Sequence, residues 1–118
     1  MQSLKDEKPP TINGDGKQTR DFTFVDNAVQ ANIKGFFASD KAKNNVFNVA
    51  GGERIDLNYL WDVLKSSANS ELNATYGPPR LGDVRDSLAN IAKAQKLMGY
   101  QPQFTVREGL RITWDWFK

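Results

Sequence analysis

Apolar residues recur at helical spacing in four stretches of the chain, and the first of these stretches follows Asp26. Val29, Ile33, Phe36 and Phe37 are spaced i, i+4, i+7 and i+8, which places them on one side of a helix. Asp26 has the short acidic side chain that commonly caps a helix N-terminus. The pattern predicts a helix from Asp26 to about residue 38, with an apolar face that belongs to the scaffold of the fold.

Three further helices are predicted by the same spacing together with signals at their ends. Asp56 is placed to cap the first of them, and Asn90 opens the second, which ends at Gly99. Thr105 and Glu108 have the spacing of a capping box at the start of the last helix. The residues predicted to face inward are Leu57, Leu60, Trp61, Leu64, Ile91, Ala94, Leu97, Met98, Val106, Leu110, Trp114 and Phe117.

Short extended segments alternate with these helices. We expect one near Thr11 and Ile12, a short strand over residues 22–25, and another between Asn44 and Ala50. The two prolines before Arg80 stop any regular element and leave the following residues extended or looped. The alternation predicts an α/β fold with short strands in a small sheet and about four helices.

The composition fits one domain and narrows the chemistry. The 118 residues can bury a single core, so we expect one compact unit. The net charge of +2 comes from scattered basic residues, which favours neither nucleic acid nor a membrane surface as a partner. The absence of cysteine and histidine excludes disulfides and thiolate metal sites and removes the usual neutral-pH proton carrier. With no spanning apolar run and no signal peptide, we expect a cytoplasmic protein.

Two arginines stand where a turn meets an ordered element. Arg20 follows the Gly14-Asp-Gly16 turn, and Arg80 follows the two prolines. Guanidinium groups bind phosphate through paired, charge-assisted hydrogen bonds, so two of them converging on one site would hold a diphosphate. Asp83, three residues after Arg80, is a natural acceptor for ribose hydroxyls beside such a site. The residues indicate a nucleotide-diphosphate ligand.

Each of these residues also has a structural interpretation. Arg20 could form a surface ion pair with Asp21 or Asp26, and Arg80 could form a similar pair. Asp83 could cap a loop or a helix. Arg85 could be a further anion contact, although a solvent-facing role suits its residue type better. The residue types alone leave these alternatives open.

Catalytic groups are missing from the pattern. Without His or Cys, a nucleophile would need a Ser, Thr, Lys or carboxylate with an activating partner, and no such pair occurs at a meaningful spacing. No Gly-x-Gly-x-x-Gly loop follows a strand, and none of the three tyrosines has a lysine four residues later. We therefore predict no catalytic residue, no metal site and no bound cofactor in this chain.

The motifs resemble the C-terminal part of the extended short-chain dehydrogenase/reductase family, the NAD-dependent sugar-nucleotide epimerases and dehydratases. Nearly the whole chain is covered, and the motifs occur in the order found in that family. They are Gly14-Asp-Gly-x-x-x-Arg-Asp-Phe-x-Phe-Val-Asp26, Val46-Phe-Asn-Val-Ala50, Arg80-x-Gly-Asp83, Leu97-x-Gly-Tyr-x-Pro102 and Glu108-Gly-Leu110. Within the family, the chain looks most like bacterial UDP-N-acetylglucosamine 4-epimerases.

The resemblance implies a substrate-binding role for four residues. In enzymes of that kind, the residues matching Arg20 and Arg80 hold the UDP diphosphate, and the residue matching Asp83 contacts the ribose. The residue matching Ser87 borders the sugar pocket, where a small side chain admits an N-acetyl group. The implied ligand is a UDP-sugar, and the implied reaction interconverts UDP-N-acetylglucosamine and UDP-N-acetylgalactosamine at carbon 4.

The resemblance also implies that residues 1–118 are the substrate-binding domain of a larger enzyme. An N-terminal Rossmann domain, absent here, would bind NAD and carry the catalytic Tyr-x-x-x-Lys pair. We therefore expect a homodimeric parent enzyme, no turnover by this chain alone, and self-association through an apolar face that the missing domain would cover. Surface polysaccharide synthesis is the pathway class that the resemblance suggests.

Three alternatives stay open. A nucleotide-sugar 4,6-dehydratase or a decarboxylase of the same family would share the arginine pair. A stand-alone nucleotide-sugar-binding or interaction module would bind UDP without catalysis. A structural domain whose arginines only form surface ion pairs would not respond to UDP at all.

Overall fold

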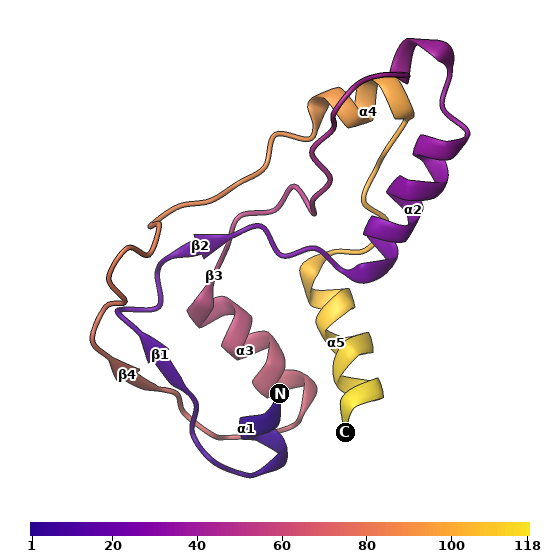
Figure 1. Cartoon of the computed structure of the whole chain (residues 1–118). Helices are drawn as coiled ribbons and strands as arrows, with labels where there is room; N and C mark the ends of the chain where they lie inside the picture. Colours follow the sequence, from indigo (N-terminus) through magenta and orange to yellow (C-terminus); the bar gives the residue numbers. More distant parts are fainter.

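Helices form where the sequence carries local start and stop signals, and strands form where distant segments meet. The computed structural model describes all residues, 1–118. Its elements, all labelled in Figure 1 except η1, are α1 (Gln2–Lys5), β1 (Thr11–Asn13), β2 (Thr19–Arg20), α2 (Val25–Phe36), the 3-10 helix η1 (Asp40–Ala42), β3 (Ile55–Asp56), α3 (Leu57–Ser67), β4 (Thr75–Gly77), α4 (Ala92–Met98) and α5 (Val106–Phe117). No helix is long and apolar enough to cross a membrane.

The predicted helix ends are confirmed for three of the helices. The Asp56 carboxylate accepts a hydrogen bond from the Tyr59 backbone N–H at 2.7 Å and caps α3. Gly99 ends α4 in the left-handed conformation that a C-terminal glycine favours. Thr105 and Glu108 form the reciprocal capping box of α5. These signals lie within one turn of the helix ends that they fix, so the sequence predicts them well.

The small sheet is observed as two separate pairs of strands. β1 lies parallel to β4, with Thr11 opposite Thr75 and Asn13 opposite Gly77. β2 lies antiparallel to β3, with Arg20 opposite Ile55. The mixed α/β class is confirmed, with strands of only two or three residues.

The strand predicted over residues 22–25 is wrong. The ladder instead ends at Arg20, and α2 begins at Val25, so that Asp26 lies in the first helical turn rather than at the cap. Phe24 packs edge-on against Phe104, with 5.1 Å between the ring centroids. It also contacts α5 at Gly109, where any Cβ would lie within 3 Å of the Phe24 ring. Tertiary packing of Phe24 overrides its β propensity.

The strand predicted between Asn44 and Ala50 is wrong as well, because no neighbouring strand pairs with it. Val46 is 87% exposed, and its carbonyl oxygen accepts a hydrogen bond from the Lys93 ammonium at 3.0 Å. Asn48 reaches the Asn90 carbonyl oxygen through its side-chain amide. The segment has the residue types of a β-strand, but no second strand lies beside it, so it forms no ladder.

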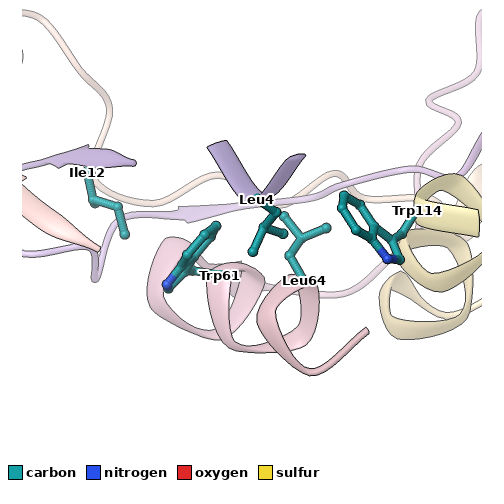
Figure 2. Packing of buried hydrophobic residues seen from close by; sticks show 5 residues of the cluster. All are labelled: Leu4, Ile12, Trp61, Leu64 and Trp114. Atoms are coloured by element: carbon teal, nitrogen blue, oxygen red, sulfur yellow. The ribbon is translucent and has the colours of Figure 1, made fainter. Parts of the chain in front are cut away.

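The main core lies between α3, α5 and the β1–β4 pair. Figure 2 shows its five buried side chains in a row, from Ile12 on β1 past Leu4 and α3 to α5. Trp61 and Leu64 belong to the predicted stripe of α3, and Trp114 to that of α5. A second, smaller cluster joins α2 to α4 and contains Ala31, Ala94 and Tyr100. The inward faces predicted for α3, α4 and α5 are confirmed at these residues.

The molecule is open rather than compact. Only 16 of 118 residues are buried, and the radius of gyration is 16.7 Å, against roughly 13 to 14 Å for a compact domain of this length. The long segment between β4 and α4 follows the outer edge without regular structure (Figure 1). The expectation of one compact unit is therefore wrong.

The predicted apolar face of α2 faces solvent rather than the core. Val29, Ile33, Phe36 and Phe37 are 49%, 56%, 83% and 78% exposed. The helix buries Ala31 and the polar Asn27 instead. We call the four exposed residues the α2 surface. Its exposure corrects the assignment of these residues to the scaffold.

Asn27 fastens α2 to the segment that leads into α5. Its side chain is 1% exposed and donates a hydrogen bond to the Phe104 carbonyl oxygen at 2.8 Å. Its amide oxygen accepts from the backbone N–H groups of Gln103 and Phe104 at 2.8 and 3.1 Å. One side chain therefore satisfies three backbone groups of a segment 76 to 77 residues away.

We expect Asn27→Ala to lower the free energy of unfolding by on the order of 3 kcal/mol, because it removes three hydrogen bonds and leaves partly buried backbone groups without their partner. Urea denaturation followed by circular dichroism measures the change. Asn32→Ala is the matched control, since Asn32 lies on the same helix, is exposed and bonds only to the Ala28 carbonyl. Equal losses in the two variants would contradict this role of Asn27.

Tyr100 links α4 to the loop before β3. Its side chain is fully buried, and its hydroxyl donates to the Ala50 carbonyl oxygen at 2.7 Å. Burial raises the pKa of Tyr100 above its ordinary value of 10.0. The folded chain therefore keeps a proton that the unfolded chain releases near pH 10.

Stability linked to Tyr100 should be complete below pH 10 and should fall as the pH rises above that value. We expect Tyr100→Phe to lose about 1 to 2 kcal/mol at neutral pH, because the Ala50 carbonyl loses its donor. The variant should also show a shallower loss of stability as the pH rises above 10. Denaturation curves across this range test both effects, and an unchanged alkaline slope would exclude the assignment to Tyr100.

Candidate functional site

The parallel pairing of β1 and β4 brings two distant loops to one edge. In a parallel pair both strands run in the same direction, so the chain leaving Asn13 and the chain leaving Gly77 emerge side by side. The Gly14 N–H donates to the Gly77 carbonyl oxygen at 3.0 Å and extends this contact by one residue. Ligands of open α/β sheets bind at this carboxyl end of the strands.

A polar cavity of about 490 Å³ opens at this edge. Its volume is within the range of small-molecule sites. One wall comes from β1 and the following turn, and the other from the chain after β4. The lining residues are Asn13, Gly14, Asp15, Gln18, Gly77, Pro79, Arg80, Asp83, Val84 and Arg85.

Arg80 is the unpaired cation of this cavity. It forms no ion pair and no side-chain hydrogen bond, whereas the other charged lining residues are all paired. It also borders a second, more apolar cavity of about 320 Å³. The surface ion pair considered for Arg80 is therefore absent, and its guanidinium is free to bind an anion.

Arg20 is directed toward Asp83. The guanidinium forms an ion pair with the Asp83 carboxylate and donates to the Val84 carbonyl oxygen at 2.7 Å. Both side chains are about 30% exposed. The predicted partners Asp21 and Asp26 are wrong, because the Asp21 carboxylate accepts from the backbone N–H groups of Gly52 and Ala89. Arg20 itself does not line either cavity.

Asp15 and Arg85 form a second ion pair across the same cavity. Two parallel hydrogen bonds join them, from Nη1 to Oδ1 at 3.0 Å and from Nη2 to Oδ2 at 3.1 Å. The Arg85 hydrogen bond is the main cause that holds the pKa of the Asp15 carboxyl below its ordinary value, with a smaller contribution from the Lys17 N–H. Sequence analysis interpreted Arg85 as solvent-facing and did not single out Asp15.

Ser87 lies at the far end of the same loop. It is exposed, forms no side-chain hydrogen bond and lines neither cavity. Its neighbour Asp86 accepts a hydrogen bond from the Thr19 hydroxyl at 2.9 Å. The structure thus brings Arg80 and Asp83 together, holds Arg20 to Asp83, and leaves Ser87 beyond the cavity wall.

The second cavity lies between β1 and α3. Pro10, Ile12 and Leu60 are among its apolar lining residues, and it shares Arg80 and Asp83 with the polar cavity. The indole N–H of Trp61, which also lines it, has no hydrogen-bond partner. Together the two cavities join an apolar compartment to a charged one.

The turn beside the cavity is held rigidly. Asn58 donates through its side-chain amide to the Asp15 carbonyl oxygen and accepts at Oδ1 from the Tyr76 hydroxyl at 2.8 Å. Gly16 has a φ of +72°, and its missing Cβ would lie 2.0 Å from the Asn58 amide oxygen. Only glycine fits there.

No group of His, Cys, Asp or Glu that could hold a metal ion is present. The arrangement can bind an anionic ligand.

Comparison with known proteins identifies the family of the chain. The family model described as GDP-mannose 4,6 dehydratase matches residues 1–113. The chain belongs to the NAD-dependent epimerase/dehydratase family. It corresponds to the C-terminal part of the family's members.

Three relatives illustrate the extent of the match. UDP-glucuronate 4-epimerase of Thermodesulfobacterium geofontis is 34% identical over 117 residues, which are 98% of this chain and 35% of that protein. The structure of the Thermotoga maritima UDP-glucose 4-epimerase with UDP-glucose has a TM-score of 0.89 at 34% identity, covering 98% of this chain and 36% of that one.

The third relative is the UDP-N-acetylglucosamine 4-epimerase of Methanobrevibacter ruminantium in complex with UDP-N-acetylmuramic acid. Its TM-score is 0.88 at 32% identity, with the same coverage of 98% and 36%. The chain therefore spans about a third of the length of these family members.

Proposed function

We propose that this chain is the nucleotide-sugar-binding part of an NAD-dependent UDP-sugar 4-epimerase. The observation that carries the proposal is the unpaired Arg80 guanidinium beside Asp83, in a cavity at the carboxyl ends of two parallel strands. A guanidinium free of protein partners supplies the charge that a diphosphate needs. The three relatives described above are named as UDP-sugar epimerases.

The diphosphate site is completed by Arg20 in this proposal. Arg20 exchanges its ion pair with Asp83 for a phosphate oxygen, because two phosphates offer more negative charge than one carboxylate. Asp83 is then free to accept hydrogen bonds from ribose hydroxyls. The exchange needs only side-chain movement, since Asp83 lines the cavity, Arg20 is bonded to it, and both side chains are partly exposed.

The substrate pair that we propose is UDP-N-acetylglucosamine and UDP-N-acetylgalactosamine. In this proposal the sugar extends from the cavity toward Ser87, which lies beyond the cavity wall on the loop that carries Asp83; because Ser87 is small and exposed, it would leave room there for an N-acetyl group. The Methanobrevibacter relative is named for UDP-N-acetylglucosamine. The physiological context that follows is the supply of sugars for polysaccharide synthesis in the cytoplasm.

The chemistry itself requires groups that this chain lacks. NAD would be held by a further domain, which would also carry the catalytic tyrosine and lysine and form the homodimer. Residues 1–118 would then contribute binding energy from the nucleotide, which positions the sugar for reaction elsewhere. The chain alone should bind the nucleotide-sugar without turning it over.

A dehydratase is the second candidate, and one observation favours it. The matching family model is described as GDP-mannose 4,6 dehydratase, although the three relatives above are epimerases. Such an enzyme would share the arginine pair and take a guanine nucleotide. The identity of the preferred base therefore separates the two candidates.

Calorimetric titration of the chain with UDP-N-acetylglucosamine, UDP, GDP and CDP tests the proposal. We expect UDP compounds to bind more tightly than GDP. Arg20→Ala and Arg80→Ala should each weaken binding by about tenfold or more, in line with 1.5 to 3 kcal/mol for a hydrogen bond to a charged group. Arg111→Ala is the matched control, because Arg111 is exposed on α5 and lies outside the cavity.

Each outcome of the titration has a distinct meaning. A preference for GDP would favour the dehydratase. Binding that neither Arg20→Ala nor Arg80→Ala weakens would contradict the diphosphate site. A folded chain that binds no nucleotide would contradict the assignment of binding to this part alone. That outcome would favour the structural-domain alternative, in which the arginines only pair with carboxylates.

The α2 surface should drive self-association of the isolated chain. Phe36 and Phe37 contact each other edge to face at 5.0 Å while remaining largely exposed. Exposed apolar patches of this kind mark interaction sites. We expect sedimentation velocity to detect concentration-dependent association, which the double substitution Phe36→Ser and Phe37→Ser reduces.

Trp116→Ser is the control for this experiment, since Trp116 is also largely exposed but lies on α5. It should leave association unchanged. A wild-type chain that stays monomeric at all concentrations would exclude association through the α2 surface.

A further inference from the structure

The loop of residues 80–88 owes its position to polar contacts. All nine of its residues are exposed, and Leu81 is completely so. No part of the loop belongs to a helix or a strand or to either apolar core cluster. We call it the clamp loop, because it carries Arg80 and Asp83. An exposed loop without apolar anchors keeps its place only through specific bonds.

Five side-chain or backbone contacts tie the clamp loop to residues 15–20. Thr19 donates through its N–H to the Arg85 carbonyl oxygen at 2.9 Å and through its hydroxyl to Asp86. Arg20 bonds to Asp83 and to the Val84 carbonyl oxygen. The remaining contact is the Asp15–Arg85 pair.

The Asp15–Arg85 pair differs from the Arg20–Asp83 pair in one respect. A diphosphate would take Arg20 away from Asp83, so that pair is lost in the complex that we propose. The Asp15–Arg85 pair uses neither Arg20, Arg80 nor Asp83, and its two bonds can persist when the ligand is bound. Asp15 also lies in a turn whose position is fixed by a hydrogen bond from the Asn58 side-chain amide to the Asp15 carbonyl oxygen.

We infer that Asp15 and Arg85 are positioning residues, which hold the clamp loop across the cavity so that Arg80 and Asp83 face the ligand. The inference rests on the proposed function for the identity of the ligand, a nucleoside diphosphate. Arg85 acts through Asp15 and does not touch the phosphates. Its guanidinium already has the bidentate carboxylate partner for which this group is best suited.

The first test needs no ligand. Hydrogen–deuterium exchange of the clamp loop is measured in the wild type, in Asp15→Asn and in Arg85→Ala. Asn keeps the oxygen that accepts the Lys17 N–H, so the turn itself is preserved. Both variants should exchange about two to five times faster in the loop, the range expected for one exposed ion pair. Asp40→Asn, which removes the exposed pair with Lys43, is the matched control.

The second test is a double-mutant cycle of affinity for UDP. Each single variant should weaken binding by about two- to fivefold. The double variant Asp15→Asn with Arg85→Ala should be no weaker than the singles, because the two residues act as one unit. Arg85→Lys should retain part of the affinity, since it keeps the charge but loses one of the two bonds.

Two results would overturn the inference. Unchanged exchange of the clamp loop in both single variants would show that other contacts position it. A loss in Arg85→Ala combined with tighter binding in Asp15→Asn would show that Arg85 binds the phosphate directly. If the wild type binds no UDP, the proposed function of the chain fails, while the exchange experiment still decides whether the pair positions the loop.

Discussion

The parallel contact between β1 and β4 is the constraint on which the candidate site depends. It joins segments 64 residues apart through only three paired positions. Two short strands are not stable by themselves in water. Here Ile12 packs into the core with Leu4 and Trp61, so α3 supports the pair from below (Figure 2). Because the pairing is parallel, the turn after β1 and the loop after β4 leave the sheet at one edge. An antiparallel pairing of the same residues would have sent them to opposite ends.

The sequence predicted the helices well and the strands poorly, and the reason is the range of the interactions involved. The caps at Asp56 and Thr105 depend on residues three positions away. A strand depends on a partner that the local sequence does not specify. Residues 46–49 have β-forming side chains and no partner, whereas β4 contains a glycine and forms a ladder because β1 lies beside it. The α2 surface shows the same limit, since periodicity finds an apolar face but not what covers it.

The same limit applies to the candidate site, where the sequence indicates the residues but not their partners. Arg20, Arg80 and Asp83 could be singled out because their residue types and motif context indicate phosphate and ribose chemistry. Their partners could not, because Arg20 pairs with a residue 63 positions away and Arg85 with one 70 positions away. Proximity in the sequence favours Asp21 as the ion-pair partner of Arg20, but the Asp21 carboxylate accepts hydrogen bonds from backbone N–H groups instead. A count of charges in the sequence therefore misses which basic residue of the cavity has no carboxylate partner, and in this structure it is Arg80.

Under the proposed function, the pairing of charges would make the site selective for the charge of its ligand. The cavity contains two arginines and two aspartates, so its formal charge is balanced before Arg20, the partner of Asp83, is counted. In that proposal, a singly charged anion would bind to Arg80 alone and leave the Arg20–Asp83 pair intact. A diphosphate would also replace Asp83 as the partner of Arg20, which would leave both carboxylate oxygens of Asp83 to accept hydroxyl hydrogen bonds. Under the proposed function, one ion pair thus couples recognition of the diphosphate to recognition of the ribose. A ligand that lacks either part loses the contacts of that part and also weakens the contacts of the other part.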